Sequence, residues 1–367
     1  MRVKLSDITQ YSKGVQINRD ELIENGDYIY LNGGINPSGR WTEANVDGNT
    51  VTISEGGNSS GYINYITEPF WCGAHCYYLF NGPKNTKYLY YALKSQQERL
   101  FAIRSGACMP NIKKSDLGKF EFEFDPNEQR QNEIVESLSR VETIMTSRKS
   151  ELELLDDLIK ARFVEMFGNP VYNEKGWETK PLLEMGKCKN GMNFRYDESG
   201  VVINCLGVGD FKDLSIIGDT TLLPTVSLNE MPSEEYLLKN DDIVFVRSNG
   251  NKALVGRSVA VYPEDTPTTF SGFCIRYRKD DQAVTIPYLL RVLKTDSIRM
   301  KMIGRGANIQ NLNQQILRKL VIPIPPIELQ NQFADFVHQV DKSKVAVQKA
   351  LDETQLLFNS LMQEYFG

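Results

Sequence analysis

Two long segments of the chain have the hydrophobic spacing of an amphipathic helix, with apolar residues at alternating steps of three and four. In the first segment, the stripe consists of Ile134, Leu138, Val141, Met145, Leu152, Leu155, Ile159 and Met166, interrupted by Arg148 and Arg162. In the second, the positions 199 residues later are Phe333, Val337, Val340, Val347, Leu351, Phe358, Leu361 and Tyr365, interrupted by Lys344 and Thr354. This heptad spacing predicts two coiled-coil helices.

Start and stop signals place the ends of both helices. Asp125-Pro126 followed by Glu128 has the spacing of a capping box, and Gly168-Asn169-Pro170 ends the stripe. Pro325-Pro326-Ile327-Glu328 opens the second helix. We therefore expect spacer helices over residues 125–168 and 326–367, each roughly 60 Å long at 1.5 Å per residue. Antiparallel pairing would return Gly367 to the neighbourhood of Met1 and make the molecule nearly cyclic.

The regions before each helix alternate like β-hairpins. Residues 50–54 and 62–66 flank a Gly-rich polar loop, and residues 242–246 and 259–262 flank another. A short helix is expected after each hairpin, over 87–104 and 287–303. The fold class is therefore α/β, with globular domains over 1–124 and 169–325 that contain mixed strands and short helices.

The chain also contains an internal repeat. Gly106-Ala107-Cys108-Met109-Pro110-Asn111-Ile112 corresponds to Gly306-Ala307-Asn308-Ile309-Gln310-Asn311-Leu312, and Glu165–Gly168 corresponds to Glu364–Gly367. Lys13-Gly14 and Asn190-Gly191 are related in the same way near the start of each copy. The sequences between these anchors differ. A repeat of this kind predicts two modules of one scaffold, related by a pseudo-twofold, with different targets.

Composition and charge leave a nucleic-acid role open. The formal net charge is −5, but the two helical segments carry −7 and the two globular segments together carry +2. Only the charge on the contacting face decides whether DNA is bound. The sequence has no apolar run of about 18 residues, so no membrane association is expected. The scattered cysteines and the polar N-terminal segment are typical of a reduced, cytoplasmic protein.

Motifs that resemble catalytic or metal sites are incomplete. Gly57-Asn58-Ser59-Ser60-Gly61 fits the spacing of a hydrolase nucleophile elbow, but a strand-like segment follows it where a helix is required. The glycines also have phosphate-loop spacing, yet Tyr62 stands where lysine is needed. Cys72-Gly73-Ala74-His75-Cys76 lacks a nearby fourth zinc ligand, and buried strand cysteines are the simpler interpretation. We therefore expect no catalytic residue, no metal and no cofactor.

The hairpin loops offer side chains that suit base reading. The candidates for contacts to base edges are Asn58, Ser59, Arg247, Asn249 and Lys252, with Tyr62 as a neighbouring aromatic residue. The candidates for phosphate contacts are Arg104, Lys113, Lys114, Arg305, Arg318 and Lys319, which flank the repeated signature. Lys13 is a further DNA-binding candidate. The alternative for each is a solvated loop residue without a partner.

The whole pattern resembles the specificity (S) subunit of type I DNA restriction-modification systems. The resemblance covers the full chain and rests on the Gly106–Ile112 signature, the helix entries at Pro126 and Pro326, and the Phe-Gly helix ends. It implies that each domain reads one half of a bipartite double-stranded DNA site while the helices set the gap. It also implies that two methylation (M) subunits dock on the repeated regions and methylate adenine with S-adenosylmethionine. Restriction (R) subunits would join them to cleave DNA.

Two other functions remain open at this point. A hydrolase or nuclease would turn over its substrate as a purified chain and lose activity in Ser59→Ala. A coiled-coil adaptor would not bind DNA even with partner subunits present. The resemblance favours a non-catalytic, DNA-reading subunit over both.

Overall fold

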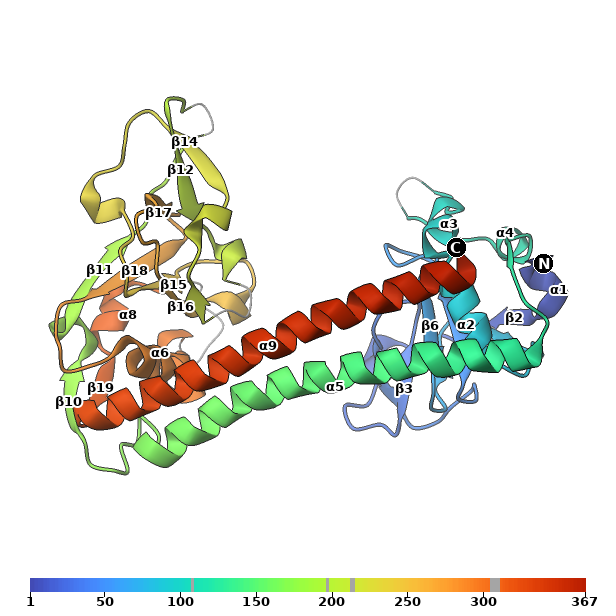
Figure 1. The fold of residues 1–367 in the computed structure, drawn as a ribbon, viewed down its shortest axis with the longest axis horizontal. Helices are drawn as coiled ribbons and strands as arrows, with labels where there is room; N and C mark the ends of the chain where they lie inside the picture. Colours follow the sequence, from blue (N-terminus) through green and yellow to red (C-terminus); the bar gives the residue numbers. More distant parts are fainter. Residues whose placement is uncertain (107–108, 196–197, 212–214, 304–310) are drawn as a thin grey trace. The chain divides into compact units, whose positions relative to one another are not determined.

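A computed structural model of the protein describes residues 1–106, 109–195, 198–211, 215–303 and 311–367 (Figure 1). The chain divides into two compact units. Unit 1 comprises Met1–Glu151 and Val347–Gly367, and unit 2 comprises Leu152–Ala346. Each unit therefore contains one globular part and a portion of both long helices. Within the described part of the chain, none of the helices has the length and apolar character needed to span a membrane.

Unit 1 has three small sheets. β1 (Arg2–Lys4) pairs with β9 (Glu121–Glu123), and the four-stranded sheet has the order β2-β8-β5-β6 (Gln10–Lys13, Cys76–Phe80, Thr50–Ser54, Ile63–Ile66). The third sheet has the order β4-β3-β7 (Gly39–Trp41, Tyr28–Leu31, Trp71–Cys72). Its helices are α1 (Leu5–Ile8), α2 (Thr86–Lys94), α3 (Gln97–Ala102) and α4 (Lys114–Gly118), with a 3-10 turn at Arg19–Glu21.

Unit 2 has sheets of the same kinds. β10 (Glu178–Pro181) pairs with β19 (Val321–Ile324), and the larger sheet has the order β11-β18-β15-β16-β13 (Gly186–Asn190, Cys274–Lys279, Asp242–Val246, Ser258–Val261, Ile216–Ile217). The smaller sheet has the order β14-β12-β17 (Thr225–Leu228, Val201–Leu206, Thr268–Phe270). Its helices are α6 (Ile286–Lys294), α7 (Asp296–Ile303) and α8 (Gln314–Arg318), and its 3-10 turns are Leu182–Glu184, Val208–Asp210, Thr220–Leu222, Glu234–Tyr236 and Lys252–Leu254.

The two globular parts share one strand topology although their central sequences differ. The sheet β2-β8-β5-β6 corresponds to β11-β18-β15-β16, and β4-β3-β7 corresponds to β14-β12-β17 with the same parallel pair between its last two strands. β13 is an additional strand of unit 2, parallel to β16. Sequence divergence between the repeat anchors thus leaves the scaffold unchanged and alters the side chains that the scaffold carries.

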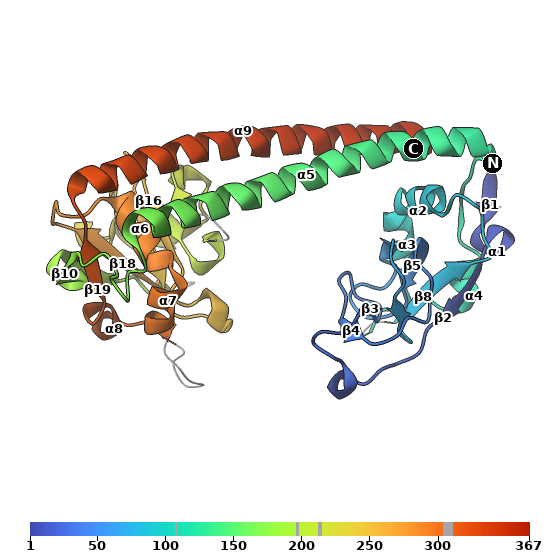
Figure 2. The same ribbon diagram turned by 90° about the horizontal axis from the view of Figure 1, so that it is seen from below.

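A short amphipathic helix lies between the larger sheet and the long helices in each unit. In unit 1, α2 packs on β5 and β6 and lies between this sheet and the long helices (Figure 2). Its buried residues Tyr88, Leu89 and Tyr91 join the core that contains Ile134 and Leu138 of α5. In unit 2, α6 packs on β16, and Leu289 and Leu290 join the core that contains Ile159 and Phe333. Because α2 and α6 bury apolar side chains on both sides, they join each sheet to the helix pair.

The long helices are α5 (Glu128–Phe167) and α9 (Ile327–Phe366), and they are antiparallel in both units. In unit 1, the guanidinium of Arg130, near the start of α5, lies 6.0 Å from the ring of Tyr365, near the end of α9. In unit 2, Phe163 of α5 and Phe333 of α9 have ring centroids 5.6 Å apart. The expected antiparallel coiled-coil pairing is confirmed.

The chain ends meet within unit 1. The Phe366 ring lies 5.5 Å from Tyr88, whose ring lies 5.4 Å from Phe124. The amino group of Met1 donates a 3.0 Å hydrogen bond to the Phe124 carbonyl. This is the closure that antiparallel helices were expected to produce.

The expected capping residue of the first long helix is wrong. Asn127, and not Asp125, accepts the backbone N–H of Arg130 through its side chain at 3.1 Å, so Asn127 is the N-cap. The Asp125 carboxylate accepts the N–H of Asn127 at 2.9 Å, one step earlier. At the other end, Gly168 has φ +74°, which favours glycine and ends the helix as expected.

The single helices expected over 87–104 and 287–303 are each two helices. The hydroxyl of Ser95 donates to the Ala92 carbonyl at 2.9 Å, and that of Thr295 donates to the Val292 carbonyl at 2.7 Å. The backbone also departs from helical geometry there, with ψ +142° at Thr295 and φ −101°, ψ +19° at Gln96, the residue after Ser95. α2 and α6 therefore end here, and α3 and α7 begin within the next two residues.

Candidate nucleic-acid interface

In each unit, the end of the repeated signature packs on the loop of the central hairpin. The Ile112 N–H donates to the Glu55 carbonyl at 2.9 Å, and the Leu312 N–H donates to the Arg247 carbonyl at 2.8 Å. Glu55 follows β5 and Arg247 follows β15, so the two contacts are equivalent. The signature therefore anchors the loop whose side chains differ between the units. Parts of the signature, residues 107–108 and 306–310, lie outside the described residues.

Hydrogen bonds hold the unit 1 loop in a defined shape. The hydroxyls of Ser54 and Ser59 both donate to the Gly33 carbonyl, and the Ser60 hydroxyl donates to the Glu55 carbonyl at 2.8 Å. The Gly57 N–H donates to the carbonyl of Pro110 in the signature at 2.9 Å. Asn58 is exposed within this fixed frame. Such a loop can present an amide side chain without a large ordering cost.

Charged groups at the base of this loop are paired. The Lys13 ammonium lies 2.6 Å from Glu55 and 5.5 Å from the centroid of the Tyr77 ring, and the His75 Nδ1 lies 3.3 Å from Glu55. Burial, followed by the nearby Glu55 charge, raises the pKa of Tyr77 to about 12. The Glu55 carboxylate therefore organises the end of β2, and Lys13 is half exposed beside it.

Tyr62 and Arg104 flank the same loop. The Lys94 ammonium lies 3.9 Å from the centroid of the Tyr62 ring. Arg104 donates through Nε to the Ser60 carbonyl at 2.7 Å and stacks on Phe101 at 3.9 Å. Lys113 is exposed where α4 begins. The fold thus brings the unit 1 candidates Lys13, Asn58, Ser59, Tyr62, Arg104, Lys113 and Lys114 to the loop or to the segment that anchors it.

The unit 2 candidates fall into two groups. Arg247, Asn249 and Lys252 all lie in the β15–β16 loop, where Arg247 donates to the Gly272 carbonyl at 3.2 Å and Asn249 forms a turn with the N–H of Asn251. Exposed Arg318 and Lys319 lie at the far end of α8, away from the turn that begins at Asn313. Arg305 lies outside the described residues.

The motifs that resemble catalytic sites take ordinary structural roles. β6 follows Ser59, so the helix that a nucleophile elbow requires does not follow that serine. Cys72 and Cys76 are buried, in β7 and β8 respectively. Hydrogen bonding to Cys76 and burial both raise the pKa of the Cys72 thiol.

Two exposed apolar side chains near the loops were not among the sequence candidates. Phe273 is 60% exposed, and its carbonyl accepts the N–H of Arg247 at 2.7 Å. Met109, within the signature, is 76% exposed. Apolar side chains at such positions can contact thymine methyl groups or enter between bases. The turn sequence Ser271-Gly272-Phe273 was the available signal for the first of them.

The architecture is that of a duplicated α/β module in which two long antiparallel helices pass through both copies. A family model described as the type I restriction modification DNA specificity domain matches residues 1–154 and 174–354. The chain belongs to this family.

Named relatives are consistent with this assignment. The StySPI type I restriction enzyme specificity subunit of Salmonella potsdam is 25% identical over 339 residues, which cover 85% of this chain and 72% of the relative. A type I specificity subunit sequence of Mycoplasma genitalium is 35% identical over 145 residues, and one of Mycoplasma pneumoniae is 36% identical over 138 residues. The chain spans 38% and 36% of the length of these two mycoplasma relatives.

Solved structures share the fold. The type I restriction-modification S subunit from M. genitalium has a TM-score of 0.61 at 22% identity, covering 100% of this chain and 96% of that chain. A chain from a structural study of complex assembly and conformational transition in the type I R-M system has a TM-score of 0.56 at 13% identity, covering 99% and 96%.

Proposed function

We propose that this chain is the non-catalytic DNA-recognition subunit of a type I restriction-modification complex, with each globular part reading one half of a bipartite site. The observation that carries the proposal is the repeated anchoring of a hairpin loop by the signature. One scaffold presents Asn58 and Tyr62 in unit 1 and Arg247 and Asn249 in unit 2. Two loops that have the same backbone framework but different side chains suit two different DNA half-sites.

The candidates divide by the DNA group that each would meet. Asn58, Ser59, Arg247, Asn249 and Lys252 would approach base edges, with Tyr62 beside them. Arginines and lysines outside the loop tips would position the DNA through its phosphates, namely Lys13, Arg104, Lys113, Lys114, Arg305, Arg318 and Lys319. Phe273 and Met109 add apolar contacts. The globular boundaries for this division are 1–124 and 169–325.

Partner subunits supply the chemistry in this proposal. Two methylation subunits dock on the repeated surfaces and modify adenine, and restriction subunits complete the complex for cleavage. A pair of like docking surfaces follows from the repeat itself, because equivalent elements recur in both units. The complex acts on DNA in the cytoplasm.

A domain exchange tests the proposal. Residues 1–124 are replaced by the matching segment of another family member, and modified adenines are mapped by long-read sequencing in cells that also express the methylation subunit. One half of the recognition sequence should change and the other should stay. The reciprocal exchange of 169–325 should change the opposite half. A change in both halves after a single exchange would refute the assignment of one half-site to each unit.

A point variant tests the loop assignment. Asn58→Ala should weaken specific binding with little change in stability, because Asn58 is exposed. Loss of one good bidentate base contact costs about 1–3 kcal/mol of discrimination. The matched control is Asn25→Ala, an exposed asparagine between the 3-10 turn at Arg19–Glu21 and β3. Equal binding by both variants would remove Asn58 from the base-reading set.

A further inference from the structure

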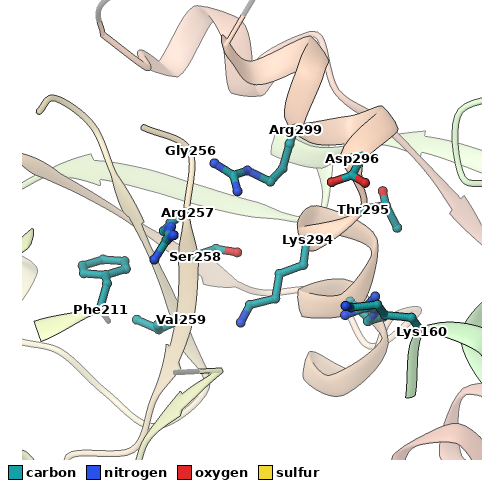
Figure 3. Close-up of a pocket in the computed structure, with 11 residues that line it drawn as sticks. Lys160, Phe211, Gly256, Arg257, Ser258, Val259, Lys294, Thr295, Asp296 and Arg299 are labelled. Carbon is teal, nitrogen blue, oxygen red and sulfur yellow. The ribbon is translucent and has the colours of Figure 1, made fainter. Parts of the chain in front are cut away.

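A cavity of about 420 Å³ in unit 2 is surrounded by cationic side chains. The cationic lining residues are Lys160, Arg257, Arg291, Lys294 and Arg299. Figure 3 shows Lys294 and Arg299 extending from α6 and α7 toward Arg257 and Ser258, which lie just before and at the start of β16. Asp296 is the carboxylate among the described lining residues. Cationic side chains from four separate segments of the chain therefore line one cavity.

We propose that this cavity is a binding site for a phosphorylated ligand with several negative charges, of the oligophosphate class. This function is separate from base reading, because none of the base-reading candidates lines the cavity. Its volume lies within the range of small-ligand pockets.

Buried polar atoms at the cavity point to a missing partner. Ser258 is 3% exposed, and among the described residues its hydroxyl has no hydrogen-bond partner. The Nε atoms of Arg291 and Arg299 are buried and equally without a partner in that part of the chain. Buried donors in native structures are nearly always satisfied, so these atoms indicate a group that the bound state supplies. Phosphate oxygens accept from hydroxyl and guanidinium donors.

Unit 1 provides an internal comparison at the equivalent place. The N–H of Gly61 donates to the Ser54 carbonyl and that of Gly256 to the Val246 carbonyl, and both glycines have positive φ. The residues that follow, Tyr62 and Arg257, are therefore equivalent. In unit 1, Lys94 at the end of α2 lies 3.9 Å from the ring centroid of Tyr62.

Unit 2 replaces that aromatic ring with a second cation. Lys294, at the end of α6, lines the cavity together with Arg257. Tyr91 of unit 1 also corresponds to Arg291, 200 residues later, in the matching helix. Unit 2 has therefore exchanged two aromatic side chains for two arginines at one place.

The surrounding charges favour a multiply charged ligand. Lys160 is paired with Asp157 at 2.6 Å, and Arg299 donates to the carbonyls of Ala253 and Val255. Behind the cavity, Asp156 and Asp341 line a neighbouring apolar hollow together with Lys344. Among the described residues, the lining of the cavity itself contains five cationic side chains and one carboxylate. A single phosphodiester would offset only one of them.

The test measures the binding of inorganic tripolyphosphate to the full chain by isothermal titration calorimetry at low salt and pH 7.5. The key variant is Arg257→Tyr, which places the unit 1 residue opposite Lys294 and fills the cavity. Its fold should persist, because unit 1 accommodates that arrangement. Lys294→Met is the second variant. The control is Lys301→Met, which removes an exposed charge from α7, the helix of Arg299.

Both cavity variants should bind tripolyphosphate about tenfold or more weakly than the parent and the Lys301→Met control, since each removes a charge-assisted contact. A thermal-unfolding shift on adding the probe, present in the parent and lost in Arg257→Tyr, would agree. Equal binding by all four proteins would overturn the proposal, because only diffuse attraction would then be acting.

A competition arm distinguishes two sources of the phosphate. If a short random duplex displaces tripolyphosphate from the parent, and Arg257→Tyr weakens duplex binding by the same factor as tripolyphosphate binding, the DNA backbone occupies the site. If duplex and tripolyphosphate bind together, the ligand is a free phosphorylated molecule. Both results support a phosphate site in unit 2, and neither depends on which bases the loops read.

Discussion

Gln131 and Gln330 occupy equivalent buried positions in the first turns of the two long helices, but they make different hydrogen bonds. Gln131 donates to the Asp125 carbonyl at 2.6 Å. Gln330 donates at 2.8 Å to the carbonyls of both Pro325 and Ala283, and it accepts the Thr285 N–H at 2.8 Å. The second glutamine therefore ties the start of α9 to the start of α6.

Gln330→Met should cost more stability than Gln131→Met. It leaves two carbonyls and one N–H without their partner, and each unsatisfied buried group costs about 1–3 kcal/mol. The expected losses are about 3 kcal/mol or more for Gln330→Met and about 1–3 kcal/mol for Gln131→Met. Urea unfolding measures both losses. Trp177 reports on unit 2 in a Trp41→Phe/Trp71→Phe background, and Trp41 and Trp71 report on unit 1 in a Trp177→Phe background. Equal losses would show that the additional bonds contribute nothing.

Lys294 gives the proposed phosphate site a pH dependence. Burial, followed by the charge of Arg291, lowers the pKa of Lys294 to about 8. A bound anion favours the charged ammonium, so affinity should be full below pH 8 and should fall as the pH rises through 8. The charged groups that face or surround this ammonium are Asp156, Lys160, Arg257, Arg291, Asp296, Arg299, Asp341 and Lys344.

Calorimetry with tripolyphosphate at pH 7 and pH 9.5 measures this effect. Lys294→Arg is the matched control, because arginine stays charged at both values and should retain binding. Any change in the charge of the probe itself affects both proteins equally. A parent whose affinity follows that of Lys294→Arg across the range would contradict the assigned role of Lys294.

At the scale of elements, packed aromatic side chains connect the sheet of each unit to the long helices. In unit 2, Phe163 and Phe167 of α5, Tyr288 of α6 and Phe333 of α9 have ring centroids 4.8–5.8 Å apart. All four are at most 3% exposed. Three helices distant in the sequence thus share one cluster.

Phe333→Ala should therefore destabilise unit 2 by about 3–5 kcal/mol, the usual cost of truncating a buried phenylalanine. Phe273→Ala is the control, because that ring is 60% exposed and its removal should change the unfolding free energy by less than about 0.5 kcal/mol. Fluorescence of Trp177 during urea unfolding follows both. Similar values for the two variants would mean that the cluster does not carry the packing of α9 on unit 2.

Periodicity in the sequence predicted the elements that depend on local pattern. The stripes from Ile134 and Phe333 predicted both long helices, and the alternation at 50–54 and 242–246 predicted both hairpins. The N-cap was misplaced because Asp125, Pro126 and Asn127 offer two polar caps within one turn. The breaks at Ser95 and Thr295 were missed because a hydroxyl bond to a backbone carbonyl leaves no trace in hydrophobic spacing.

Long-range features were beyond the reach of sequence patterns. The shared strand order of the two globular parts arises from equivalent pairings made by different residues, such as Ile53 with Tyr77 in unit 1 and Phe245 with Ile275 in unit 2. The cationic cavity unites Lys160, Arg257 and Lys294, which are more than 30 residues apart in the chain. The structure places the base-contact candidates on or beside the two hairpin loops, Arg305 lies outside the described residues, and DNA contact by any of the candidates stays a prediction.

At the scale of the whole molecule, the repeat makes a spacer role testable. Asp156 and Lys344 form an ion pair at 2.7 Å between α5 and α9, so the two helices have a fixed register within unit 2. Exposed Lys149 and Gln348 are equivalent positions, 199 residues apart, one turn or more from that pair. Insertions at both sites would keep the antiparallel register, because each helix gains the same length.

Inserting seven residues after Lys149 and seven after Gln348 should lengthen the gap between the recognition halves and leave the halves unchanged. Seven helical residues add about 10 Å, which corresponds to about three base pairs. A heptad also preserves the apolar stripe, so packing should survive. Mapping of modified adenines measures the gap, and insertion in α5 alone is the control that should abolish modification by breaking the register. A gap that stays constant with both insertions would refute the spacer role of the helices.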